Sequence, residues 1–142
     1  MRLEETRFVS RPIEEVFAYT ADFANIENWD PGVESSRMVG DGPAQLGTVY
    51  DLMVKFGAAA SPMKYEITAY EPPNRVVLVG TGDKVDAVDE IRFSRADNMT
   101  RIDYTADLDF KGVLRFIAPL ARGTMRKVGT KALDGLVEAL SK

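Results

Sequence analysis

The chain has 142 residues, 45% of them hydrophobic and 28% charged, which is the composition of an ordinary globular protein with one domain over residues 1–142. It contains no cysteine and no histidine, so disulfides, thiolate metal sites and catalysis by a histidine base are excluded. The formal charge is −4 and no segment is strongly basic, so we expect no nucleic-acid partner.

The first part of the chain predicts one strand followed by two short helices. Residues 1–10 alternate loosely between polar and apolar side chains, as a strand does. Pro12 marks the start of a helix, and apolar residues follow it from Ile13 at helical spacing. Asp22 can cap a second short helix. Pro31 ends that helix, because the residue before a proline disfavours helical backbone.

From residue 33 onward the apolar period changes to two, which is the period of a strand. Strands joined by short links are expected at 47–56, 63–71, 75–82, 84–95 and 100–110. In the last of these, acidic and threonine side chains alternate with apolar ones. The pattern favours an antiparallel sheet with one face toward water.

The C-terminal stretch, residues 112–142, returns to the helical period. Its apolar stripe, which we expect to be mostly buried, consists of Met125, Val128, Ala132, Leu136 and Leu140. Pro119 lacks the backbone donor that a helix interior needs, so the helix should kink or break near it. A long helix laid across one curved sheet would bury the apolar faces of both.

The order of these elements, together with four segments of sequence, resembles the START-like superfamily, also called SRPBCC, in its polyketide cyclase/dehydrase and lipid-transport branch. The segments are SRPIEEVFAYTADFANIENWDPGV (10–33), KVDAVDEIRF (84–93), TRIDYTADLDFKG (100–112) and LDGLVEAL (133–140). The resemblance covers nearly the whole chain. It implies an α+β helix-grip fold, in which a curved antiparallel β-sheet wraps around a long C-terminal α-helix. Two short helices follow the first strand, and a cavity lies between sheet and helix.

Members of this superfamily bind lipids, sterols, quinones or polyketides, and a minority catalyse cyclisation or dehydration. The resemblance therefore implies binding or transport of a small hydrophobic molecule, with no cofactor and no metal. Two alternatives are a cyclase- or dehydratase-type enzyme and a protein-interaction module whose own side chains close the cavity. The missing histidine and the scarcity of inward ionisable residues favour a non-catalytic binding protein.

The candidate ligand-binding residues have inward parity on the expected strands or lie on the helices that face them. They are Trp29, Tyr50, Leu52, Val54, Met63, Tyr65, Ile67, Asp89, Ile91, Tyr104, Leu108 and Met125. The tyrosines offer an apolar body and one hydroxyl each, which suits a mostly apolar pocket, although they could equally fill the core. Trp29 is the only tryptophan. We interpret it mainly as a packing residue between the short helices and the sheet, with stacking on a ligand as the alternative.

Asp89 interrupts the apolar pattern of its strand, because it shares the parity of Ala87 and Ile91. Alternation therefore points its carboxylate into the interior, where burial raises the pKa of a carboxyl group. This makes Asp89 the candidate catalytic residue, which in an enzyme would act together with the inward tyrosines as acid and base groups. The alternative is a structural role, through a hydrogen bond to backbone, an ion pair with an arginine, or a bulge that turns it outward. Contact between Asp89 and a tyrosine in a wet cavity would favour the enzyme.

The sequence also predicts where the protein acts. No apolar run approaches the roughly 18 residues needed to cross a bilayer, and the charged start, MRLEETRF, lacks the apolar stretch of a signal peptide. We therefore expect a cytoplasmic protein without integral membrane association. The one basic cluster, residues 122–131, is interpreted as a solvated helix face, with anion binding as the alternative.

Overall fold

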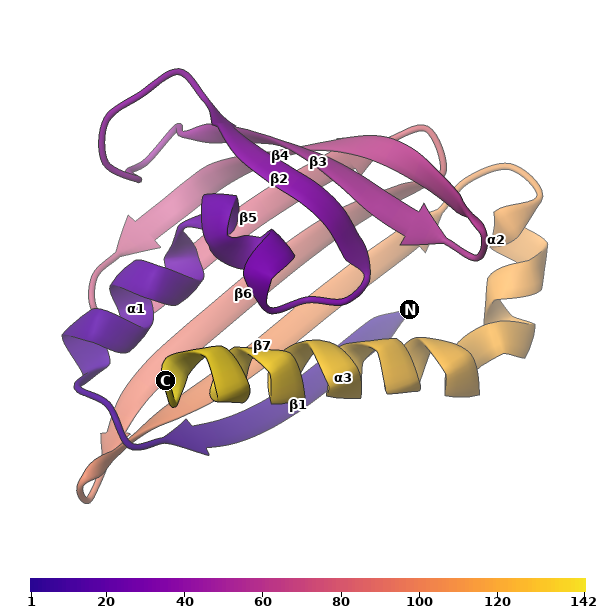
Figure 1. Cartoon of the computed structure of the whole chain (residues 1–142). Helices are drawn as coiled ribbons and strands as arrows, with labels where there is room; N and C mark the ends of the chain where they lie inside the picture. Colours follow the sequence, from indigo (N-terminus) through magenta and orange to yellow (C-terminus); the bar gives the residue numbers. More distant parts are fainter.

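A computed structural model describes residues 1–142 and contains one antiparallel sheet that curves around the C-terminal helix (Figure 1). The strands are β1 (Arg2–Val9), β2 (Val33–Val39), β3 (Val49–Phe56), β4 (Ala59–Glu71), β5 (Arg75–Gly82), β6 (Val85–Ala96) and β7 (Met99–Phe110). Their order across the sheet is β1-β7-β6-β5-β4-β3-β2. Strands β2 to β7 follow one another as antiparallel neighbours, and β1 closes the far edge beside β7.

The helices fall in the two places that the sequence predicted. Between β1 and β2 lie α1 (Ile13–Ala21) and the 3-10 helix η1 (Phe23–Asn28), and after β7 come α2 (Leu114–Ile117), the 3-10 helix η2 (Ala118–Ala121) and α3 (Arg122–Leu140). The Asp22 carboxylate caps η1 by accepting a 3.1 Å hydrogen bond from the backbone nitrogen of Ala24. The break predicted near Pro119 is confirmed, because η2 separates α2 from α3. In Figure 1 the C-terminal end of α3 lies near α1 and its N-terminal end lies near α2.

The helix-grip fold predicted from the sequence is therefore confirmed, with one strand added to it. The sequence analysis placed no separate element at β2. Only two of its seven side chains, Val33 and Ser36, are buried, so the strand lacks the apolar alternation that identified the others. Strand β2 forms an edge of the sheet, and its register with β3 shifts between Val33 and Ser35.

The apolar core fills the space between the sheet and the helices α1, η1 and α3. Its largest fully buried side chains include Phe23, Ile67, Leu78, Ile91 and Leu136. Gly135 allows α3 to approach η1 closely, since a Cβ atom there would overlap the carbonyl oxygen of Trp29. The identity of this one residue thus sets how near the long helix lies to the short ones.

All the buried side chains of α3 lie in its C-terminal half. The predicted apolar stripe is buried at Ala132, Leu136 and Leu140. Met125 is only partly buried and Val128 is 41% exposed, so the prediction of a mostly buried stripe is wrong for its first two members. The physical reason is that both side chains border a cavity, which leaves them without sheet side chains to pack against.

Candidate ligand-binding site

A cavity lies between the sheet and the N-terminal half of α3, and it has two adjoining parts. The outer chamber has a volume of about 480 Å³ and is lined from β3, β4, β6, β7, α2, η2 and α3, with 14 hydrophobic residues among its 20. The inner chamber, of about 140 Å³, lies among Trp29, Asp89, Tyr104 and α3. The two chambers share Asp30, Tyr65, Leu108, Met125 and Val128. The protein's own side chains thus leave a space in the size range of small-molecule sites.

Tyr65 forms part of the wall between the two chambers. Its ring lies flat against Gly80 of the neighbouring strand, where an added Cβ would come within 2.6 Å of the ring atoms. The rings of Tyr65 and Phe23 pack in a T-shaped arrangement, with their centroids 5.3 Å apart. The Tyr65 hydroxyl makes no hydrogen bond to another protein group, and burial raises its pKa well above the usual value. Tyr65 therefore offers an unpaired hydroxyl to whatever enters the cavity.

Asp89 borders the inner chamber and is 6% exposed. In the pairing of β6 with β7 it lies opposite Ala106, so Tyr104 is its diagonal neighbour on the same face. The Tyr104 hydroxyl donates a hydrogen bond to Asp89 Oδ2. Burial raises the pKa of Asp89 to about 7, while this hydrogen bond lowers it and the nearby carboxyl of Asp30 raises it. The inward direction predicted by strand parity is the one observed, and the partner is a tyrosine rather than an arginine.

Asp30 is a residue of the site that the sequence analysis missed. Its Oδ1 accepts a 2.8 Å hydrogen bond from the backbone nitrogen of Gly32, and the residue borders both chambers. Burial raises the pKa of Asp30 to about 6. The sequence analysis interpreted the Asp-Pro-Gly sequence only as the end of a helix. The turn explains the backbone conformation and the hydrogen bond of one carboxyl oxygen, but not the position of the residue beside the cavity. The signal that could have identified Asp30 is its position next to Trp29.

Trp29 connects η1 to both other layers of the protein. Its indole ring is buried and meets the ring of Tyr104 edge-on, with centroids 6.3 Å apart and planes at 71°. Its backbone carbonyl lies against Gly135 of α3. The indole also forms part of the inner-chamber wall, and its Nε1 has no hydrogen-bond partner. Trp29 therefore packs the layers together and borders the cavity at the same time.

Eight of the twelve candidate residues line the cavity. They are Trp29, Val54, Met63, Tyr65, Asp89, Tyr104, Leu108 and Met125. The other four, Tyr50, Leu52, Ile67 and Ile91, are buried in the core and border neither chamber. Tyr50, for example, packs near Phe23 of η1, with ring centroids 6.2 Å apart. Strand parity thus identified the inner face of the sheet, but not the part of that face which the helices leave open.

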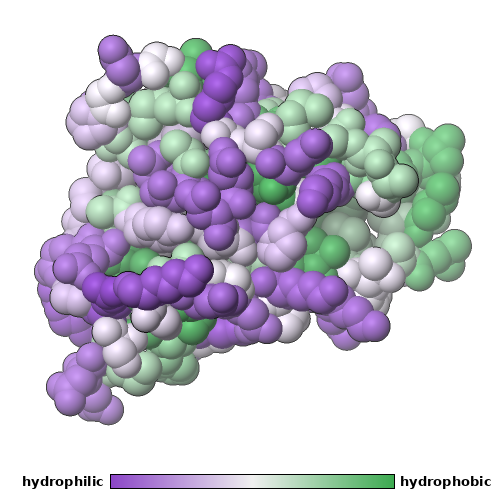
Figure 2. Space-filling model, viewed as in Figure 1, coloured by the Kyte–Doolittle hydropathy of each residue, from purple (hydrophilic) through white to green (hydrophobic).

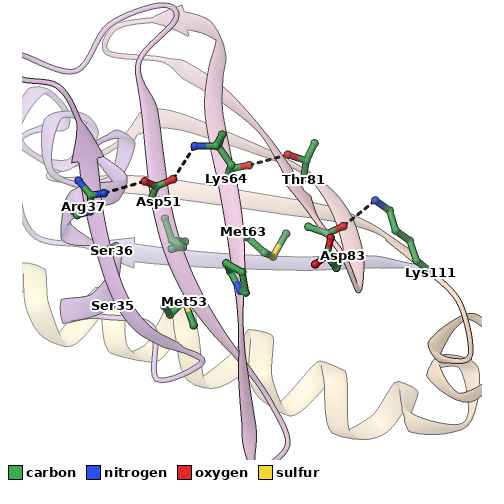
Figure 3. Close-up of a pocket in the computed structure, with 13 residues that line it drawn as sticks. Ser35, Ser36, Arg37, Asp51, Met53, Met63, Lys64, Thr81, Asp83 and Lys111 are labelled. Carbon is green, nitrogen blue, oxygen red and sulfur yellow. Dashed lines mark hydrogen bonds and ion pairs between the residues drawn. The ribbon is translucent and has the colours of Figure 1, made fainter.

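A larger hollow, of about 660 Å³, lies on the opposite face of the sheet (Figure 3). Asp51 forms ion pairs there with Arg37 at 3.2 Å and Lys64 at 2.9 Å, which link β2, β3 and β4. Only three of the 13 residues around this hollow are hydrophobic. Because its charged side chains pair with one another and it has little apolar surface, the hollow is a weaker candidate for a small-molecule site than the cavity.

Comparison with known proteins identifies similar chains. The family model described as "Polyketide cyclase / dehydrase and lipid transport" matches residues 1–141, whereas no curated protein sequence matches. A solved structure from Thermus thermophilus is 17% identical with a TM-score of 0.80, covering 99% of this chain and 97% of that one. The Zhui aromatase/cyclase from Streptomyces sp. R1128 is 18% identical with a TM-score of 0.75, covering 99% and 90%. A START superfamily protein from Mycobacterium smegmatis is 16% identical with a TM-score of 0.74, covering 99% of both chains.

Proposed function

Because the chain belongs to the polyketide cyclase/dehydrase and lipid-transport family, we propose that it binds a small, largely apolar molecule non-covalently in the cavity between the sheet and α3. The observation that carries this proposal is the cavity itself, in which a mostly hydrophobic outer chamber adjoins a small chamber bordered by a few polar side chains. Removing apolar ligand surface from water, at about 25 cal/mol per Å², would drive binding. A few polar groups would fix the orientation of the ligand.

The arrangement of the two chambers predicts how the ligand lies. Its apolar body would occupy the outer chamber, and one polar group would reach the inner chamber beside Tyr65 and Asp89. A ligand hydroxyl there can accept a hydrogen bond from Tyr65 and donate one to Asp89. A hydrocarbon of the same shape would leave the Tyr65 hydroxyl unpaired, which we expect to cost about 1–3 kcal/mol of binding free energy.

A neutral fluorescent probe, N-phenyl-1-naphthylamine, tests the proposal by titration. We expect one site with a dissociation constant in the micromolar range, where the binding free energy is about −8 kcal/mol. Leu108 borders both chambers, so Leu108→Trp should fill the cavity and weaken binding at least about tenfold. The matched control is Met53→Trp, which adds the same side chain beside the hollow on the outer face.

The two variants distinguish binding in the cavity from binding in the hollow on the outer face. If Met53→Trp weakens binding and Leu108→Trp does not, the probe occupies the outer hollow and the proposed site is wrong. Native mass spectrometry of freshly purified protein adds a test without any probe. A co-purified small molecule should be displaced by the probe from the wild type and be absent from Leu108→Trp.

The Asp89–Tyr104 pair favours a second candidate function, which is proton transfer to or from the bound molecule. A general acid or base works best when its pKa lies near the working pH, and burial brings the pKa of Asp89 to about 7. An enzyme of this kind would convert a polyketide-like substrate, and Asp89→Asn would abolish conversion while retaining binding. A binding protein would return the same compound unchanged, which mass spectrometry of the incubated mixture distinguishes.

A further inference from the structure

Large apolar side chains are exposed on one short segment at the rim of the outer chamber. Val113, Phe116, Ile117 and Leu120 are 71%, 73%, 47% and 87% exposed, and we call these four residues the rim patch. Figure 2 shows the hydrophobic surface at the right-hand edge of the molecule, where Figure 1 places α2. The same segment lines the outer chamber through Leu114 and other residues. A contiguous exposed apolar patch of this kind marks an interaction surface more often than an ordinary solvated face.

The sequence around the rim patch is basic, although the protein as a whole is acidic. Residues 111–133 contain six basic and no acidic side chains, while the rest of the chain has 12 basic and 22 acidic ones. The six are Lys111, Arg115, Arg122, Arg126, Lys127 and Lys131. Lys111 pairs with Asp86 at 3.0 Å, and the other five form no ion pair. Two of these exposed unpaired cations adjoin the exposed apolar side chains, since Arg115 lies within the segment and Arg122 directly follows it.

We propose that the rim patch docks the protein onto the surface of an anionic lipid bilayer. The apolar side chains would enter the interface between headgroups and acyl chains, and the flanking arginines and lysines would lie among the phosphates. No helix of the protein is both long enough and apolar enough to cross a bilayer, so the contact is peripheral. The unpaired cations would also orient the molecule, with the rim patch toward the membrane.

The charges around the patch distinguish a bilayer from a second copy of the chain. A symmetric dimer formed through the rim patch would bring two sets of unpaired cations together, which opposes association. An anionic bilayer instead offers an apolar interior for side chains such as Phe116 and Leu120, and negative headgroups for the cations. Docking would place the rim of the cavity against the lipid. Neither the docking nor this placement depends on the proposed ligand-binding function.

Sedimentation with lipid vesicles tests the docking of the full chain. We expect binding to vesicles of phosphatidylcholine mixed with phosphatidylglycerol, and binding at least about tenfold weaker to vesicles of phosphatidylcholine alone, since each basic side chain near the surface adds about fivefold in affinity. Salt should weaken the binding. No binding to the mixed vesicles, or equal binding to both kinds, would overturn the proposal.

Paired substitutions then locate the contact. Phe116→Ser combined with Leu120→Ser should weaken binding to the mixed vesicles at least about tenfold, because it removes the two most exposed large side chains of α2 and η2. The matched control is Leu46→Ser, which removes a leucine that is 65% exposed between β2 and β3. It should bind as the wild type does. Equal losses in the control and in the double variant would overturn the assignment of the surface.

The basic side chains are tested in the same way. Arg115→Gln combined with Arg122→Gln should weaken binding roughly 10- to 30-fold, whereas Arg37→Gln combined with Arg92→Gln, on the outer face of the sheet, should leave it unchanged.

Sedimentation velocity without lipid should show a monomer. A dimer that Leu120→Ser dissociates would instead make the patch a self-interface. If the wild type binds the mixed vesicles but does not bind the probe, the ligand-binding function alone is refuted.

Discussion

The buried carboxyl group of Asp89 predicts that the protein loses stability as the pH rises toward neutrality. Its pKa is 3.8 when solvated, as in the unfolded chain, and about 7 in the folded protein, where burial raises it. Between these values the folded state keeps a proton that the unfolded state has released. The stability that the neutral carboxyl contributes is therefore complete below about pH 4 and is lost as the pH rises through 7. The difference of about three pKa units corresponds to about 4 kcal/mol.

Asp89→Asn removes this titration and keeps the shape of the side chain. Its amide oxygen can still accept the hydrogen bond from Tyr104. We therefore expect the variant to match the wild type in acid and to exceed its free energy of unfolding by roughly 2–4 kcal/mol at pH 8. Asp30 titrates with the same sign and is present in both proteins, so their difference reports Asp89 together with its coupling to Asp30.

Urea denaturation followed by circular dichroism, at pH 5 and at pH 8, measures this difference. Asp109→Asn is the matched control, because it removes an exposed aspartate from the end of β7. This control should lose the same free energy of unfolding between pH 5 and pH 8 as the wild type. If Asp89→Asn also loses as much stability as the wild type over this range, the carboxyl is not the titrating group and the reasoning is refuted.

Two further predictions concern the contacts around the site. Gly135→Ala should lower the free energy of unfolding by about 1–3 kcal/mol, because its Cβ would overlap the Trp29 carbonyl oxygen. Gly123→Ala, in the same helix with open space around it, should be neutral or slightly stabilising in the same melting experiment. Tyr104→Phe removes the donor that lowers the pKa of Asp89, so the pH at which stability is lost should move upward, and an unchanged midpoint would contradict the hydrogen bond.

Most of the fold was predictable because local chemistry determines where its elements begin and end. Asp22 has a side chain that caps η1, and Pro119 lacks the donor that a continuous helix would need, so both boundaries follow from single residues. The alternation of strands β3, β4, β6 and β7 follows from the geometry of the pleat, whereas β5 is apolar on both faces. Strand β2 escaped prediction because it is an edge strand with few buried side chains, and it is positioned by pairing with β3.

The candidate site was only partly predictable, because parity specifies a face but not a location along it. Tyr65 and Tyr50 share inward parity, yet only Tyr65 borders the cavity, whereas Tyr50 packs near η1. That difference depends on where each helix crosses the sheet, which is a tertiary property. Asp30 was missed for a related reason: its turn explains one carboxyl oxygen locally, and only the position of α3 makes the residue part of the site.

The half-packed state of α3 has a consequence for how fast the cavity exchanges its contents. The C-terminal half is held by buried side chains such as Leu136, but the N-terminal half lies over empty space and begins at the break formed by η2. Amide hydrogens of residues 123–130 should therefore exchange with solvent through local opening well before those of residues 132–140. A small molecule could enter by the same fluctuation, on the time scale of a fraying helix. Mutations that stabilise the whole fold would then leave the residence time of the bound molecule unchanged.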